Sequence, residues 1–98
     1  AIRTEGAKII AREIGKSIDY VMVLVEAGIS ASFGKKNSPI AYVEVKNSGN
    51  LSSVLTSKLT QVLCDLIQNE LSIAKDRIYI ELQESERHLW GWNGKTFA

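Results

Sequence analysis

Two parts of the chain repeat hydrophobic residues with the period of an α-helix. The first predicted helix lies between Thr4, a candidate N-cap, and Gly15, a stop signal. Its apolar positions are Ala7, Ile10, Ala11 and Ile14. The second spans residues 53–71, where one face is apolar and the opposite face is polar. The apolar face consists of Leu55, Leu59, Val62, Leu63, Leu66 and Ile67.

Three other segments have the composition of β-strands. Residues 20–25 form a dense β-branched and aromatic run, which predicts a strand buried on both faces. Residues 40–46 alternate apolar and polar side chains, and residues 76–82 read as a third strand. The segment 47–50 is a predicted turn, and the aromatic tail 90–94 is rich in turn residues.

The two halves of the chain resemble each other at an offset of 57 residues. This offset places Ile10 on Ile67 and Asp19 on Asp76, so that helix and strand coincide. Two amphipathic helix–strand pairs also align to some degree by chance. If the repeat is real, the strand that precedes the second helix has a counterpart before Ala1, because a crossover helix packs against the two strands that it connects. We therefore expect that the first strand of the fold is absent from this sequence.

Length and composition indicate one small globular domain covering residues 1–98, with 45% hydrophobic side chains. A core of this size is marginal alone and gains from oligomerisation. Basic and acidic residues number 12 and 11 and are intermixed, which argues against nucleic-acid partners and an anionic membrane surface. No apolar run approaches the roughly 20 residues of a membrane span.

Cysteine and histidine usage argues against metal and redox chemistry. Cys64 is the single cysteine, which excludes an internal disulfide and favours a reducing compartment, and His88 is the single histidine. We expect no metal and no cofactor. The charged run 84–88 is interpreted as an exposed turn without a chemical role.

Several short motifs occur in an order that is typical of one family. They include Gly-Lys at 15–16, Asp-Tyr-Val-Met at 19–22, Ser-Phe-Gly at 32–34, Asn-Ser-Gly at 47–49, Asp-Arg-Ile-Tyr-Ile at 76–80 and Trp-Asn-Gly-Lys-Thr-Phe at 92–97. Their order and spacing resemble the macrophage migration inhibitory factor and dopachrome tautomerase family over the whole chain. The terminal Gly-Trp-Asn-x-x-Thr-Phe pattern is the most specific part.

The resemblance implies an α/β (α+β) subunit of two pseudo-symmetric β-α-β units. These would form a four-stranded mixed sheet with two helices on one face, its first strand missing here, and three subunits would close into a homotrimer. It also implies a keto–enol tautomerase of the phenylpyruvate or dopachrome type. The family's general base is an amino-terminal proline, whose pKa is lowered toward neutrality by its pocket. This chain begins with Ala1 and contains no such catalytic residue, and the amine of Ala1 is expected to lie far from the pocket.

The resemblance implies a substrate-binding role for five residues. Lys16 matches a lysine that holds a substrate carboxylate, although a solvated lysine after a helix stop is the simpler interpretation of the sequence alone. Ser48 matches a position where the family uses a backbone amide, and otherwise it is a turn residue. Tyr79 matches a pocket tyrosine contributed across a subunit boundary, and otherwise it packs as an ordinary strand residue.

The other two residues depart from the family or are ambiguous. Glu81 stands where many members have asparagine, and a carboxylate there would repel anionic substrates unless it pairs with Lys16 or another cation. Trp90 stands where a pocket-lining apolar residue is expected, and an interface role is equally compatible with it. The cysteine pair proposed for oxidoreductase activity in some members is absent, since Ile40 and Val43 occupy those positions.

Three hypotheses about function follow. The first is a phenylpyruvate-type tautomerase acting on a small aromatic keto or enol acid, which requires a proline before Ala1 and is inactive without it. The second is a non-catalytic, cytokine-like protein that keeps the trimer and binds a protein receptor. The third is a fragment with no function by itself, because its sheet lacks a strand. The expected location is the cytoplasm, and the family also acts outside cells without a signal peptide.

Overall fold

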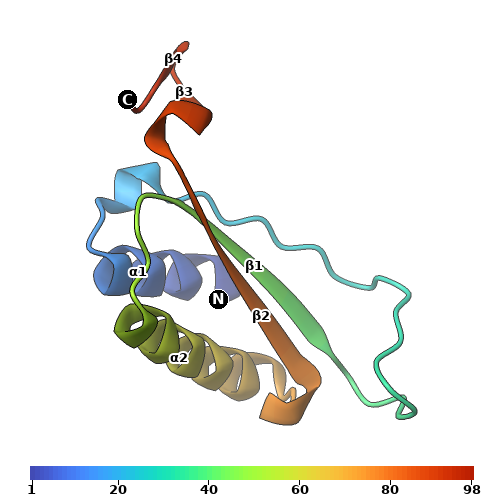
Figure 1. The fold of residues 1–98 in the computed structure, drawn as a ribbon. Coiled ribbons are helices and arrows are strands. Elements are labelled where there is room, and N and C mark those ends of the chain that lie inside the picture. The colour runs from blue at the N-terminus through green and yellow to red at the C-terminus, as the bar shows by residue number, and fades with distance from the viewer.

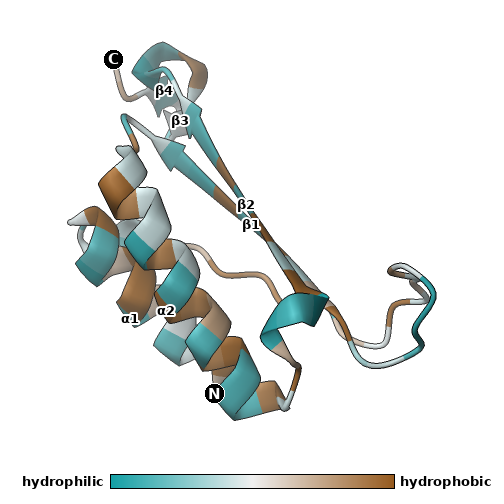
Figure 2. Ribbon diagram, turned by 60° about the horizontal axis from the view of Figure 1, so that its bottom comes forward, coloured by the Kyte–Doolittle hydropathy of each residue, from teal (hydrophilic) through white to brown (hydrophobic).

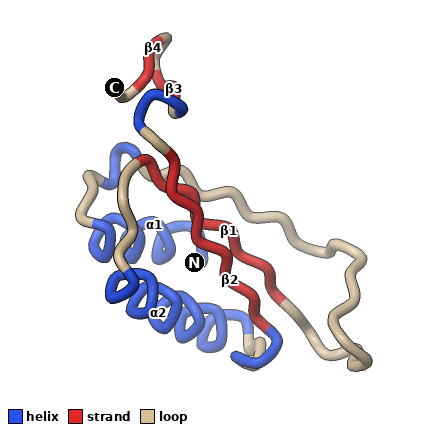
Figure 3. Tube along the Cα trace, viewed as in Figure 1, coloured by secondary structure: helices blue, strands red, loops and turns tan.

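The computed structural model describes residues 1–98 and contains two long helices packed against a parallel pair of strands (Figure 1). The helices are α1 (Ile2–Ile14) and α2 (Ser53–Leu71), and the paired strands are β1 (Ala41–Ser48) and β2 (Ile78–Ser85). Three single-turn 3₁₀ helices are η1 (Ile18–Tyr20), η2 (Lys75–Arg77) and η3 (Arg87–Leu89). Figure 3 shows that both helices lie on the same side of the strands. The expected α+β class with two helices on one face is confirmed.

Helix α1 starts earlier than its sequence predicts. Ala1 takes the N-cap position without a side-chain hydrogen bond, so Thr4 lies inside the helix and its prediction as the cap was wrong. The helix ends as expected at Gly15, which adopts φ +80° and donates its backbone N–H to the Ala11 carbonyl at 2.9 Å. Glycine tolerates this left-handed conformation at little cost.

Helix α2 has the bounds that its amphipathic pattern predicts. Ser52 caps it, and its side chain accepts a hydrogen bond from the Leu55 N–H at 3.2 Å. The apolar face supplies the best buried side chain of the protein, Leu59, which is fully buried. Leu59 and Leu63 pack with Ile9 of α1 and Val45 of β1 into the main core. Figure 2 shows hydrophobic and hydrophilic segments alternating along both helices.

Strands β1 and β2 pair in parallel along their full length, from Ala41 opposite Ile78 to Ser48 opposite Ser85. Successive side chains alternate between the two faces. The apolar residues point to the helices and the other face is exposed: it carries Tyr42, Glu44, Lys46, Tyr79, Glu81 and Gln83. Both strands match their predicted segments, shifted by one to three residues at each end.

The internal repeat is evident in the structure. At the offset of 57 residues the end of α1 at Ile14 falls on the end of α2 at Leu71, and the left-handed cap Gly15 falls on Ser72, which is also left-handed with φ +56°. The turn η1 falls on η2 residue for residue. Two successive helices therefore end in the same cap and the same 3₁₀ turn.

The strand predicted over residues 20–25 is not formed, and this prediction was wrong for the structure. Tyr20 ends η1, and the backbone of residues 21–32 runs without ladder hydrogen bonds. Met22 and Leu24 are 82% and 83% exposed. A segment becomes a strand only by pairing, and no other strand lies beside this one to supply partners.

The tail folds into a small hairpin of β3 (Gly91–Trp92) and β4 (Lys95–Thr96). Asn93 and Gly94 form its turn with positive φ angles of +54° and +79°. Backbone bonds from the Phe97 N–H to the carbonyls of Arg87 and Trp90 fix the hairpin against η3. The turn-rich tail of the sequence is thus an ordered element at the carboxyl end of β2 (Figure 1).

Candidate functional site

Lys16 and Ser48 meet at the carboxyl end of β1. The ammonium group of Lys16 donates a hydrogen bond of 2.9 Å to the backbone carbonyl of Ser48. Lys16 follows the α1 cap, and its own N–H bonds to the Ala11 carbonyl at 3.0 Å, which sets its position. Ser48 is the last residue of β1, and the Gly49 N–H after it bonds to the Ser85 carbonyl at 3.0 Å. Two of the five predicted site residues are therefore in direct contact.

The Lys16 ammonium lies in a cationic environment. Partial burial lowers its pKa, and the nearby Arg87 guanidinium lowers it further by repulsion between like charges. Neither side chain forms an ion pair with a carboxylate. An ammonium with two free N–H donors, beside a second cation, can bind an anionic oxygen.

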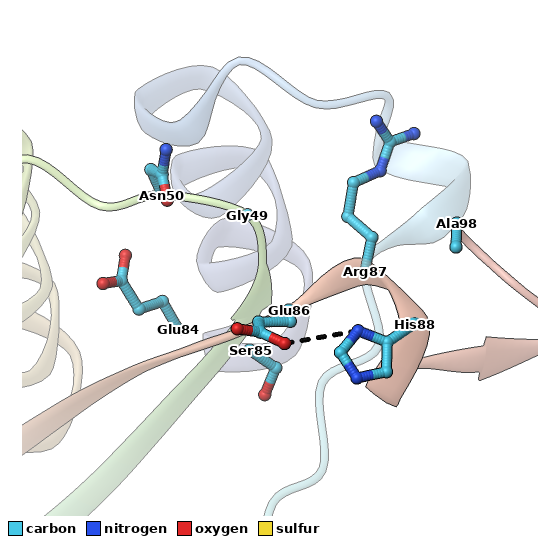
Figure 4. A pocket seen from close by; sticks show the side chains of 8 residues that line it. All are labelled: Gly49, Asn50, Glu84, Ser85, Glu86, Arg87, His88 and Ala98. Carbon is cyan, nitrogen blue, oxygen red and sulfur yellow. Dashed lines mark ion pairs between the residues drawn. The ribbon is translucent and has the colours of Figure 1, made fainter.

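A shallow groove of about 600 Å³ opens beside this pair, between the turn after β1, the end of β2 and η3. Figure 4 shows its charged lining: Glu86 and His88 face each other at 3.3 Å, and Arg87 points away from both. The Glu84 carboxylate accepts a hydrogen bond of 2.8 Å from the Leu51 N–H and closes the turn. The run 84–88 is thus partly a structural turn, and Arg87 acts on Lys16, an effect that the sequence did not indicate.

Trp90 lies at the same end of the sheet, directly after η3. Its N–H bonds to the Arg87 carbonyl at 3.3 Å, and its own carbonyl accepts from the Phe97 N–H at 3.1 Å. Its side chain is half-buried. The backbone thus ties Trp90 to the residue whose charge reaches Lys16.

Three further aromatic rings gather at this end and were missed as site residues. Tyr20 contacts Trp92 edge to face with 5.3 Å between ring centroids, and Phe97 at 6.4 Å. Trp92 and Phe97 are stacked at 6.3 Å. The sequence predicts a buried strand at Tyr20 and therefore does not predict its contacts with Trp92 and Phe97. Tyr20, the last residue of η1 and four residues beyond Lys16, instead presents its ring to the C-terminal hairpin.

The structure places Tyr79 and Glu81 elsewhere. Both lie on the exposed face of β2, and Tyr79 is 62% exposed. Ser85, the partner of Ser48, is six residues after Tyr79, which corresponds to roughly 20 Å along an extended strand. One chain therefore cannot bring Tyr79 and Lys16 to the same small ligand.

The carboxylate of Glu81 has a partner, although not a cation. It accepts a hydrogen bond of 2.8 Å from the Tyr42 hydroxyl on β1. This bond, with smaller effects from desolvation and from the charges of Glu44 and Glu81, raises the pKa of Tyr42 to about 12. The pairing with Lys16 that could have neutralised Glu81 does not occur within the chain.

The remaining candidates have structural roles. Cys64 packs on the apolar side of α2, and burial raises the pKa of its thiol. No group of three or more acidic, histidine or cysteine side chains is arranged to hold a metal ion. Neither helix combines the length and the apolar character that crossing a bilayer requires.

Comparison with known proteins agrees with this architecture. The family model described as "Macrophage migration inhibitory factor (MIF)" matches residues 1–98. A macrophage migration inhibitory factor from Xenopus laevis is 30% identical over 91 residues, covering 93% of this chain and 79% of the relative. A homolog from Brugia malayi is 30% identical over 98 residues, covering all of this chain and 85% of the relative.

Solved structures agree as well. The crystal structure of a macrophage migration inhibitory factor homologue from Prochlorococcus marinus superposes with a TM-score of 0.92 at 37% identity, over 97% of this chain and 83% of that one. The factor from Trichinella spiralis has a TM-score of 0.90 at 24% identity and supports the fold alone. The fold is that of an α+β domain of the tautomerase type. The chain belongs to the macrophage migration inhibitory factor family.

Proposed function

We propose that this chain is the body of a keto–enol tautomerase that acts on small aromatic keto or enol acids as a homotrimer. The observation that carries the proposal is the ammonium group of Lys16 held at 2.9 Å on the Ser48 carbonyl, beside the Arg87 charge and without a carboxylate partner. In this role Lys16 binds the substrate carboxylate by a charge-assisted hydrogen bond. In the same proposal, the backbone around Ser48 and the ring of Trp90 contact the same substrate.

Tyr79 supports the trimer. Because it lies roughly 20 Å along the strands from Ser48, it reaches a pocket of this kind only on a neighbouring subunit. Its exposed phenol would then donate a hydrogen bond to the ligand of that neighbour, and Glu81 would border the same pocket. A trimer would also cover the open edges of the sheet.

The proposed base is a proline that precedes Ala1. A secondary amine with a pKa near neutrality can take a proton from carbon and return it to oxygen. The amine of Ala1 itself does not fit this role, because α1 separates it from Lys16 by 13 helical residues, roughly 20 Å. Cytoplasmic location, with activity outside the cell as well, belongs to the same proposal.

The test begins with the natural protein. Its intact mass should exceed that of the 98-residue chain by roughly 1.5–2 kDa, the weight of one strand and loop. Native mass spectrometry should give three copies, and absorbance should follow phenylpyruvate from enol to keto form. Replacing the amino-terminal proline by alanine should abolish turnover. A trimer with a free proline and no turnover would contradict the proposal.

The second candidate is a non-catalytic protein that keeps the trimer and binds a receptor. Glu81 favours it, because its unneutralised carboxylate borders the proposed pocket and repels anionic substrates. The variant Glu81→Asn distinguishes the two. If the natural protein is inactive and this variant turns phenylpyruvate over, the pocket has lost its substrate through Glu81. If both are active, the second candidate is wrong.

A further inference from the structure

Arg77 is a buried arginine that holds a distant loop. It is the last residue of η2 and is only 7% exposed. Its guanidinium donates hydrogen bonds to the backbone carbonyls of Phe33 at 2.9 Å, Lys36 at 3.2 Å and Ser38 at 3.1 Å. Between them Phe33 and Lys36 form a β-bridge around the Gly34 turn. The loop therefore has a fixed shape, although it belongs to no named strand or helix (Figure 1).

The same arginine contacts an aromatic pair. Its Cζ lies 4.9 Å from the centroid of the Phe33 ring, within the range of a cation–π contact. The Phe33 ring in turn stacks on Tyr79, with 4.8 Å between centroids and 22° between planes. Arg77 therefore fixes both the backbone and the ring of Phe33, and that ring is the surface against which Tyr79 lies.

A contribution to stability alone does not explain why an arginine is buried at position 77. No carboxylate neutralises its charge, and its Nε is buried without a hydrogen-bond partner. A buried charge of this kind is costly, and apolar side chains often replace one without loss of stability. What an apolar residue cannot supply is a rigid fork of donors aimed at three carbonyls of one loop.

We propose that Arg77 is a positioning residue that fixes the ring of Tyr79 through Phe33. The proposal rests on the function given above, in which Tyr79 donates a hydrogen bond to a ligand in a neighbouring subunit. Arg77, just before β2, and Tyr79, within β2, thus have separate roles. Arg77 holds the loop, and Tyr79 presents its phenol in one orientation instead of several.

The first measurement is independent of catalysis. The 98-residue chain contains three tyrosines, and selective ring labelling with assignment by Tyr79→Phe identifies the NMR signals of Tyr79. Phe33→Leu removes the stacked ring and defines the unstacked chemical shift. Arg77→Lys keeps the charge but loses the planar fork, and it should move the Tyr79 signals toward the Phe33→Leu position. Arg12→Lys, a change at an exposed arginine of α1, should leave them in place.

The second measurement uses phenylpyruvate kinetics. Arg77→Lys and Phe33→Leu should each raise KM roughly three- to tenfold, the effect of one weakened hydrogen bond, with kcat nearly unchanged. A merely structural role would lower the amount of folded enzyme and leave KM as it was. Tyr79 signals that stay in place in both variants, or an unchanged KM in both, would overturn the proposal.

Failure of the proposed function gives a different result. If the natural protein has no turnover, the tautomerase assignment is wrong, and the NMR shifts still decide whether Arg77 positions Tyr79. If Arg77→Lys does not fold, Phe33→Leu decides the outcome, because Phe33 is only half-buried and its loss leaves the three hydrogen bonds to backbone carbonyls possible.

Discussion

The ammonium nitrogen of Lys16 lies 2.9 Å from the backbone carbonyl oxygen of Ser48, 32 residues further along the chain. This hydrogen bond joins the end of α1 to the end of β1 and holds the ammonium at the edge of the sheet. Because a carbonyl leaves the positive charge unneutralised, Lys16 remains available to an anion. The functional predictions start from this contact.

Replacing Lys16 by glutamine should weaken binding of a carboxylate substrate. A hydrogen bond to a charged group contributes about 1.5–3 kcal/mol, which corresponds to a rise in KM of roughly 10- to 100-fold. The free energy of unfolding should change by less than about 0.5 kcal/mol, since the bond is exposed. Steady-state kinetics and urea denaturation measure the two effects. Lys58→Gln, an exposed change on α2, is the control, and an equal loss in both variants would contradict the role of Lys16.

Replacing Arg87 by glutamine should raise the pKa of Lys16. The guanidinium now lowers it by repulsion, in addition to the larger effect of burial. A lysine whose pKa is lower in the folded than in the unfolded state disfavours folding when it is protonated. The stability of the native protein therefore rises as the pH increases through the lowered pKa, and this rise should be smaller in the variant.

The pKa of Lys16 can be measured directly by NMR titration of its side-chain nitrogen. Lys95→Gln removes a cation from the C-terminal hairpin that does not contribute to the shift, and it serves as the matched control. Equal Lys16 titration curves in the native protein and in Arg87→Gln would show that the two charges do not interact.

Replacing Glu81 by glutamine should return the pKa of Tyr42 from about 12 toward its ordinary value of 10.0, because the acceptor carboxylate is its main cause. A tyrosine whose folded pKa is raised stabilises the fold below the unfolded pKa and loses that contribution as the pH rises to about 12. Absorbance of tyrosinate follows the titration. In Tyr42→Phe the late transition should be missing, and its persistence there would assign it to another tyrosine.

Replacing Leu59 by alanine should destabilise the protein by about 3–4 kcal/mol, because its side chain is fully buried between α1, α2 and β1. Val54→Ala lies on the same helix at 80% exposure and should change stability by less than about 0.5 kcal/mol. Urea denaturation compares the two. A cost for Leu59→Ala no greater than that of the control would mean that the core is packed differently.

The sequence predicted the elements whose patterns are local. The alternation of apolar and polar residues set the bounds of α2 at Ser53 and Leu71, and the stop at Gly15 followed from its left-handed preference. The strand prediction for residues 20–25 failed, because an apolar run indicates only that a segment is able to pair. Whether a strand forms depends also on a partner strand beside it, which local sequence does not reveal. Thr4 failed as a cap because α1 continues to Ile2.

The site divides in the same way. Family motifs pointed to Lys16, Ser48, Tyr79, Glu81 and Trp90 as candidates, and no periodicity in the sequence singles them out. Contacts between distant segments could not be predicted from the sequence. The hydrogen bond from Arg77 to Phe33 and the repulsion between Arg87 and Lys16 correspond to no local sequence pattern. The cluster of Tyr20, Trp92 and Phe97 depends on the hairpin folding back over η1.

The parallel pairing of β1 with β2 also bears on the order in which the protein folds. The unit β1–α2–β2 is contiguous, and most of the segment that joins its two strands is helix α2, which forms from local contacts. Helix α1 is joined to β1 by residues 15–40, which contain no named strand and only the short helix η1, so its docking must order an irregular connection. The second repeat is therefore expected to be the folding nucleus, and the amides of α1 should acquire protection from hydrogen exchange last.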